Sequence, residues 1–472
     1  MRRNLLKIWV LALALLMPCA ALAAPLANPR TMTFPPLSFE IPKAERVQLK
    51  NGMIVYMLEN HELPLVNVTA YVKTGSIYDP ADKTGLAGIT GEVMRSGGTQ
   101  AIPPDRLDAE LEFMASSIET SIGPESGSAN FSCLTKNLDR TMELFAQVLM
   151  HPAFDEERLN VAKNGAIDAL RRQNDDPKAV ADRELGKAVY AGHPLGRYPT
   201  IASISAITRD DLVAFHRRYF RPEGMILAVS GDFDRKAFLA SLEKDFAGWE
   251  PPAEPLPAVG EPVAVKPAIL YAPKDVSQTV IRMGHLGITK DNPDLYAIRV
   301  MDYILGGGFT SRLTTEIRSN LGLAYNVYSY FDVGRQFTGT FRADTETKTD
   351  TTVQVIGLMK KIIAGMTKKP VSDQELKLAK DYIINSFVFG FTKPEMVVTQ
   401  RARLEFFGYP EGYLENYRKK IAKVTKEDVL RVAKKYLQPE KLTIVVVGDG
   451  AKFDKPLSTL GKVREIDLSG EK

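Results

Sequence analysis

The sequence predicts an α+β protein built from two homologous halves. Three observations support this: a gapless internal repeat, strand-like segments interleaved with longer helices, and a proline-rich segment between the two copies. Strands and helices alternate without the strict βαβ order of a parallel sheet, which favours the α+β class. With 472 residues, 44% of them hydrophobic, the chain can bury more than one core.

The repeat begins at Thr208 and again at Thr425, an offset of 217 residues. The two copies are TRDDLVAFHRRYFRPEGMILAVSGDF and TKEDVLRVAKKYLQPEKLTIVVVGDG, and Gly231 and Gly448 keep the same offset. Each copy is typical of an N-capped amphipathic helix, a turn with proline, and an apolar strand ending in Gly-Asp. A gapless match of this length indicates duplication.

Each half opens with strand-like alternation. In the first half this covers residues 47–60, with Asn51-Gly52 as a turn, and residues 64–76; in the second it covers residues 268–287. Helical periodicity follows at residues 105–118 and 139–150. Prolines recur from residue 250 to 268, which is typical of an extended linker. We therefore divide the chain into a signal peptide (1–23), a first half (24–250), a linker (251–265) and a second half (266–472).

The first 23 residues predict an export signal. A basic start, MRRNLLK, precedes an apolar run and the small-residue site Ala21-Leu22-Ala23. The run is shorter than the roughly 20 residues that span a membrane, so no stable membrane insertion is expected after cleavage. Cys19 raises a lipoprotein alternative, which the preceding Pro18 disfavours. The expected location is the periplasm or the outside of the cell.

Cleavage would remove three basic residues and no acidic ones. The Lys and Arg count then falls from 61 to 58 against 57 Asp and Glu, a net charge of about +1. No clustered basic face indicates nucleic-acid binding. Cys133 would be the one cysteine left, so no intrachain disulfide is expected, and its alternating surroundings favour a buried apolar role.

Several segments together resemble the pitrilysin/insulinase family of zinc metallopeptidases, in its short two-domain, mitochondrial-processing-peptidase-like form. In chain order they are NGMIVYMLENHELPLV, TGSIYDP with GLAGITGEVM, HPLGRYPTIASISAI, YILGGGFTSRLTTEIRSNLGLAYNVYS and EFFGYPEGYLENY. The resemblance implies two halves, each a mostly antiparallel sheet with helices packed on it. It also implies that these halves form half of a clamshell around a peptide chamber.

The resemblance also locates a zinc site that this chain has lost. Active relatives bind zinc through H-x-x-E-H on one helix, with the Glu as general base, and through a Glu on a later helix. The corresponding positions here are Gly88, Gly91, Glu92 and Ala169. A catalytic zinc needs three protein donors, so we expect no metal and no cofactor in this chain. A loose cation site at Glu92 and Asp168 is an alternative, against ordinary solvated carboxylates.

The second half keeps residues that the resemblance places near the chemistry. Active chambers in the family share an Arg and a Tyr seven residues apart, which match Arg318 and Tyr325 here. A Tyr hydroxyl or a guanidinium stabilises the oxyanion formed during peptide hydrolysis. The plainer interpretation is a surface Arg and a half-buried strand Tyr kept for packing. The glycine run 306–308 before them lets backbones approach closely.

These features lead to one expected function and two alternatives. We expect a periplasmic, zinc-free subunit that pairs with an H-x-x-E-H-bearing relative and supplies Arg318 and Tyr325 to zinc on that partner. Unfolded or short peptides would be the substrates, captured by strand addition. The first alternative is a non-catalytic peptide-binding or assembly protein with the peptidase fold. The second is an autonomous metalloendopeptidase, as family membership alone would suggest.

Overall fold

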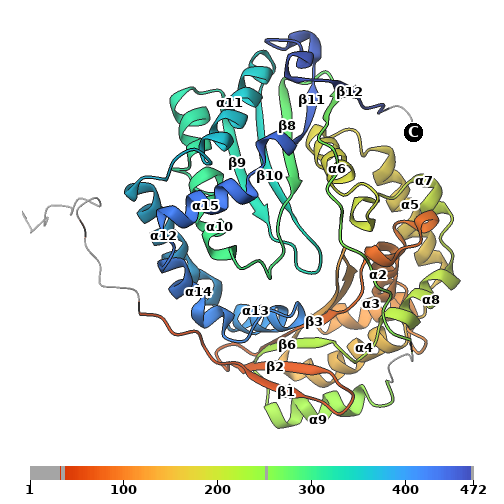
Figure 1. The fold of residues 1–472 in the computed structure, drawn as a ribbon. Coiled ribbons are helices and arrows are strands. Elements are labelled where there is room, and N and C mark those ends of the chain that lie inside the picture. Colours follow the sequence, from red (N-terminus) through yellow and green to blue (C-terminus); the bar gives the residue numbers. More distant parts are fainter. Residues whose placement is uncertain (1–31, 33–37, 250–253, 469–472) are drawn as a thin grey trace, which may run out of the picture. The chain divides into compact units, whose positions relative to one another are not determined.

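Two six-stranded mixed sheets organise the chain in the computed structural model, which describes residues 32, 38–249 and 254–468 (Figure 1). The predicted signal peptide, including Cys19, lies outside these residues. The first sheet has the order β1-β2-β6-β3-β5-β4 and the second the order β12-β7-β11-β8-β10-β9. Most neighbours are antiparallel; only β2–β6, β7–β11 and β7–β12 are parallel. The predicted class of two α+β halves with mostly antiparallel sheets is confirmed.

The first half contains six strands and eight longer helices among the described residues. Its elements are β1 (Glu45–Gln48), β2 (Ile54–Glu59), β3 (Leu65–Val72), α2 (Leu86–Ser96), α3 (Pro104–Phe113), β4 (Ser117–Ile122), β5 (Gly127–Leu134), α4 (Leu138–Met150), α5 (Glu156–Arg171), α6 (Pro177–Val189), α7 (Ile201–Ser205), α8 (Arg209–Tyr219), β6 (Ile226–Gly231) and α9 (Arg235–Asp245). The turn at Asn51-Gly52 joins β1 to β2 as predicted, with Gly52 at φ 90°. Cys133 lies buried on β5.

The second half repeats this arrangement. Its elements are β7 (Ile269–Pro273), β8 (Gln278–Leu286), α10 (Leu295–Asp302), π-helical η5 (Tyr303–Gly307) and η6 (Thr314–Asn320), β9 (Ala324–Asp332), β10 (Thr340–Lys348), α11 (Thr352–Gly365), α12 (Asp373–Ser386), α13 (Pro394–Phe406), α14 (Tyr413–Ala422), α15 (Lys426–Tyr436), β11 (Thr443–Gly448) and β12 (Val463–Glu465). Residues 254–268, the described part of the predicted linker and its continuation, contain no helix or strand. No described helix is both long and apolar enough to cross a membrane.

The offset of 217 residues relates whole elements of the two halves. It carries α8 onto α15, β6 onto β11 and α6 onto α13, each with the same start and end. Thr208 and Thr425 both begin their helix with a capping box, closed by Asp211 and Asp428. The duplication inferred from the sequence is therefore visible in the fold.

Each half covers one face of the other half's sheet with a helix. Helix α6 of the first half packs on β8 and β11 of the second sheet, and α13 of the second half packs on β2 and β6 of the first (Figure 1). Val180, Ala181 and Leu185 of α6 share an apolar cluster with Val280 and Val445. Burying such side chains stabilises the fold by roughly 1.5–3 kcal/mol each. This exchange was not predicted from the sequence.

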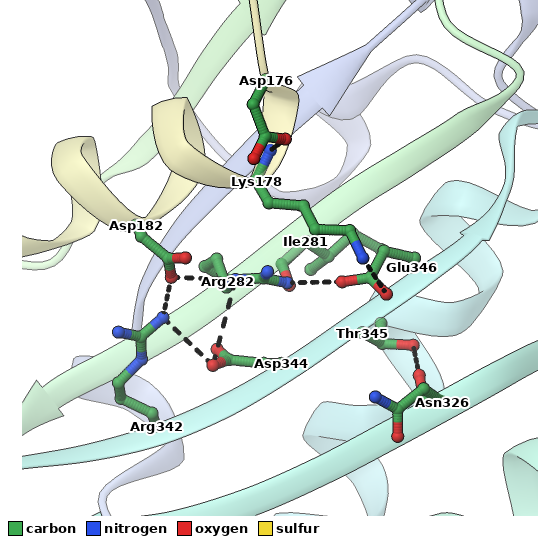
Figure 2. A network of polar contacts seen from close by, with 10 residues as sticks. All are labelled: Asp176, Lys178, Asp182, Ile281, Arg282, Asn326, Arg342, Asp344, Thr345 and Glu346. Carbon is green, nitrogen blue, oxygen red and sulfur yellow. Dashed lines mark hydrogen bonds and ion pairs between the residues drawn. The ribbon is translucent and has the colours of Figure 1, made fainter. Parts of the chain in front are cut away.

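Charged residues fix α6 on the second sheet (Figure 2). Asp182 of α6 accepts hydrogen bonds from Arg282 of β8, at 3.0 Å, and from Arg342 of β10. The Arg342 guanidinium also lies 3.1 Å from Asp344. The Arg282 and Asp344 side chains are only 4% and 1% exposed. Because an unpaired buried charge is costly, α6 and the two strands need one another.

We predict that Asp182→Asn lowers the free energy of unfolding by about 1–3 kcal/mol, since two guanidinium groups lose a charged acceptor. Urea unfolding measures this. Exposed Asp175, just before α6, provides the control Asp175→Asn, which should change little. An equal effect of both substitutions would contradict this account of the junction.

A buried histidine should make stability depend on pH. His216 on α8 bonds the Leu149 carbonyl at 2.8 Å, and burial lowers the pKa of its ring to about 4 from an ordinary 6.5. Between these values the unfolded chain binds more protons, so we expect stability to fall as pH drops through this window, by up to about 3 kcal/mol. Denaturant unfolding at several pH values tests this. His216→Gln should remove the effect, whereas exposed His151→Gln should retain it.

Candidate functional site

Helix α2 carries three of the four predicted zinc-site positions. Gly85, at φ 106°, precedes the helix, and the Asp79 carboxylate accepts hydrogen bonds from the Gly85 and Ala87 amides at 2.8 and 2.9 Å. These bonds satisfy amides that a helix start leaves without partners. Helix α2 then packs against β4, α8 and α5. Since α5 carries Ala169, the fold brings the helices that bear all four positions together.

The four positions differ in their surroundings. Gly88 and Glu92 on α2 and Ala169 on α5 are exposed to solvent. A Cβ atom added to Gly88 would meet nothing within 4 Å. Gly91 is buried instead, and a Cβ atom there would lie 2.6 Å from the Ile122 backbone nitrogen of β4. The general-base position is therefore occupied by close packing between α2 and β4.

These residues do not fit a zinc ion. Glu92 supplies the one donor side chain among the four positions, where a catalytic zinc needs three. No group of three or more His, Cys, Asp or Glu side chains in the described residues could hold a metal ion. Asp168, considered as a cation ligand with Glu92, lies 3.0 Å from Arg171 in an exposed ion pair.

The second half shows the same close approach of helix and edge strand. Gly306, in the segment that continues α10, would place a Cβ atom 2.2 Å from the Ser329 nitrogen of β9. Strand β9 is the edge of the second sheet, as β4 is of the first. The expectation that the run 306–308 permits close backbone contact is confirmed. A glycine thus allows close contact between a helix and the edge strand in both halves, at Gly91 against β4 and at Gly306 against β9.

Arg318 and Tyr325 lie together on the surface. The Arg318 guanidinium carbon is 4.7 Å from the centre of the Tyr325 ring and 4.6 Å from that of Phe309. Tyr325 is 80% exposed and Phe309 71% exposed. Tyr325 is thus not a half-buried packing residue, as the plainer interpretation required. Cation–π contacts with both rings hold Arg318 beside the tyrosine.

Sequence reasoning missed Phe309. No local pattern singles it out, because Phe309 meets Arg318 only in the folded chain. The glycine run leads into Phe309, η6 places Arg318, and β9 begins with Tyr325 one residue in. Three consecutive segments therefore build the stack.

The fold and the degenerate site define a peptidase-like protein of two homologous halves. Comparisons with known proteins agree. Residues 54–200 match the family model described as insulinase, peptidase family M16, and residues 206–383 match the model of the peptidase M16 inactive domain. The chain belongs to peptidase family M16, the insulinase family. Within it, the chain is an M16-type peptidase-like protein of the inactive kind.

Some relatives are named zinc proteases and another is named a non-peptidase homolog. The chain is 26% identical to the non-peptidase homolog YmxG of Helicobacter pylori over 84% of this chain and 91% of that protein. It is 24% identical to an uncharacterized zinc protease of Rickettsia felis over 82% of this chain and 93% of the relative. The names alone therefore do not decide activity.

Solved structures share the fold. The peptidase M16 inactive domain of Pseudomonas fluorescens superposes with a TM-score of 0.78 at 26% identity, over 86% of this chain and 98% of that one. The periplasmic protease PqqL of Escherichia coli gives 0.73 at 16% identity, over 87% of this chain and 46% of PqqL. The latter likeness concerns the fold alone.

Gly91 and Gly88 form a matched pair for testing the packing of α2. We predict that Gly91→Ala destabilises the chain by about 1–3 kcal/mol, because the added methyl group meets the β4 backbone. Gly88→Ala, exposed on the same helix, should stabilise it by roughly 0.5–1 kcal/mol through helix propensity. Urea unfolding of both variants measures the difference. Equal responses would show that α2 is not held against β4.

Proposed function

We propose that this chain is a zinc-free subunit of a heterodimeric metallopeptidase, supplying Arg318 and Tyr325 to peptide hydrolysis at zinc held by a partner. The partner is a family relative with an intact H-x-x-E-H motif. The observation behind this proposal is the exposed Arg318–Tyr325 stack in a chain whose own zinc positions lack ligands.

The stack has suitable chemistry for this role. The exposed Tyr325 hydroxyl is available to donate a hydrogen bond to an oxyanion, and the guanidinium beside it adds positive charge. The Arg318 guanidinium lies beside the Phe309 and Tyr325 rings and forms no ion pair among the described residues, so its N–H donors are available to a substrate carbonyl. Because its two aromatic rings are largely exposed, the stack buries little apolar surface and contributes little to stability.

Substrate capture follows from the edge strand that contains Tyr325. Strand β9 pairs with β10 on one side and is the end of its sheet on the other. An extended peptide can add to such an edge through backbone hydrogen bonds, which suits unfolded or short peptides of varied sequence. A peptide bound there would pass close to the Tyr325 side chain.

The proposed location is the periplasm, or the outside of the cell. Support comes from the basic start, the apolar run and the small-residue site within residues 1–23. A cleaved chain would need no membrane anchor to meet its partner. N-terminal sequencing of the chain recovered from its native compartment would test the cleavage.

A second candidate is a non-catalytic peptide-binding or assembly protein. The burial of Gly91 against β4 favours it, because the base position now serves packing. The Helicobacter pylori relative is itself named a non-peptidase homolog. A stable homodimer with no zinc-bearing partner would support this candidate. Stoichiometric zinc in the purified chain would instead support an autonomous metalloendopeptidase, which the residues at the four positions do not favour.

The trans-acting role predicts that activity appears only when both subunits are mixed. Hydrolysis of a generic unfolded peptide is measured for the chain alone, the partner alone and the mixture. Tyr325→Phe should lower the rate of the mixture by about 10²- to 10³-fold, as expected for loss of an oxyanion donor. Arg318→Ala should also lower it strongly.

The matched control is Tyr382→Phe, a substitution of another exposed tyrosine in the second half. It should leave the rate unchanged. A mixture whose rate survives both Tyr325→Phe and Arg318→Ala would exclude the trans-acting role. Gel filtration of each mixture checks that the substituted chains still pair with the partner.

A further inference from the structure

A second potential binding site lies at the far end of β9. A cavity of about 710 Å³ is bounded by α10, the end of β9, α12, α13 and α14. Asp332 lines it, whereas Tyr325 lies seven residues earlier on the strand, roughly 23 Å away along an extended chain. The cavity is therefore distinct from the Arg318–Tyr325 stack and from the degenerate zinc positions.

Three arginines line this cavity without carboxylate partners. Arg299, Arg335 and Arg403 form no ion pair with any residue in the described parts of the chain. Arg299 donates only a long bond, 3.5 Å, to the Phe331 carbonyl, and Arg335 lies 4.9 Å from the Phe407 ring centre. A guanidinium presents a planar fork of donors that matches a carboxylate or phosphate.

The lining of the cavity carries more positive than negative charge. Asp332 on the wall is the one acidic lining residue. Asp302, one turn beyond Arg299 on α10, is buried, and burial raises the pKa of its carboxyl to about 7 despite the nearby Arg299. Three guanidinium groups thus line the cavity with one lining carboxylate, while the Asp302 carboxyl lies near Arg299 and the Glu125 carboxyl near Arg335. An anion is the favoured ligand.

The remaining walls are aromatic, with one unusual amide. Tyr417 stacks on Phe387 with ring centres 5.4 Å apart, and Tyr413 lies 5.9 Å from Tyr417. Gln400 also lines the cavity, and its buried side-chain oxygen has no hydrogen-bond partner among the described residues. Because that oxygen is shielded from solvent, a ligand in the cavity does not reach it.

We propose that this cavity binds the C-terminal end of a peptide. The free carboxylate meets the arginines, and an apolar terminal side chain lies against the aromatic wall. The volume is in the range of ordinary small-ligand sites, roughly 300–1,000 Å³. This assignment does not depend on the trans-acting role of Arg318 and Tyr325, and it would give either candidate function a means to recognise peptide ends.

Calorimetric titration of the purified chain tests the proposal with N-acetyl-phenylalanine, its carboxamide and inorganic phosphate. The acid should bind at least about tenfold more tightly than the carboxamide, because only the acid offers an oxyanion to the arginines. Inorganic phosphate, which lacks an aromatic group, should bind more weakly than the acid. Equal affinity for acid and carboxamide, or no binding of the acid, would overturn the proposal.

Variants then locate the binding. Arg403→Gln and Arg335→Gln alter exposed residues, and each should lower the affinity for N-acetyl-phenylalanine by about tenfold. Arg464→Gln, an exposed arginine on β12 outside the cavity, should not. A loss of the same size in Arg464→Gln would show that nonspecific charge accounts for the binding. Phosphate binding as tight as that of the acid would make the cavity a general oxyanion site and overturn the peptide assignment.

Discussion

The reciprocal exchange of α6 and α13 is the contact on which the rest of the fold depends. A mixed sheet that exposed one apolar face would be unstable in water, and in each half that face is covered by the other half's helix. The hydrogen-bonded ion pairs of Asp182 with Arg282 and Arg342 fix the orientation of α6 on the second sheet, where the rest of the contact is apolar. Neither half is complete without the other, so the two sets of site residues are held in one framework.

Packing also explains the degenerate helix. Gly91 brings α2 against β4 as Gly306 brings the end of α10 against β9. In both halves a glycine allows helix and edge strand to approach within the space that a side chain would need. The position of the catalytic base has thus become a structural contact, while the neighbouring Gly88, Glu92 and Ala169 remain exposed.

Strand β9 connects the two features that point to function. The Phe309–Arg318–Tyr325 stack stands at its beginning and the arginine-lined cavity at its end. Between them β9 is the end strand of its sheet, and its Val327 and Phe331 carbonyls accept hydrogen bonds from Thr314 and Arg299. Guanidinium groups beside aromatic rings occur at both ends, a combination suited to the carbonyl, carboxylate and side-chain groups of peptides. In both proposals, therefore, peptide recognition lies in the second half.

The sequence by itself determined the duplication and the α+β class and predicted zinc-site positions without ligands, because repeats, periodicity and side-chain identity are local properties. It also paired Arg318 with Tyr325, since a spacing of seven residues across one turn is a local relation. Only the tertiary structure decided that α6 and α13 exchange sheets, that Gly91 is closed by β4, and that Phe309 completes the stack. It alone gathered Arg299, Arg335 and Arg403 around one cavity. These contacts join residues far apart in the chain, and local hydrophobic patterns record that a face is buried but not which element buries it.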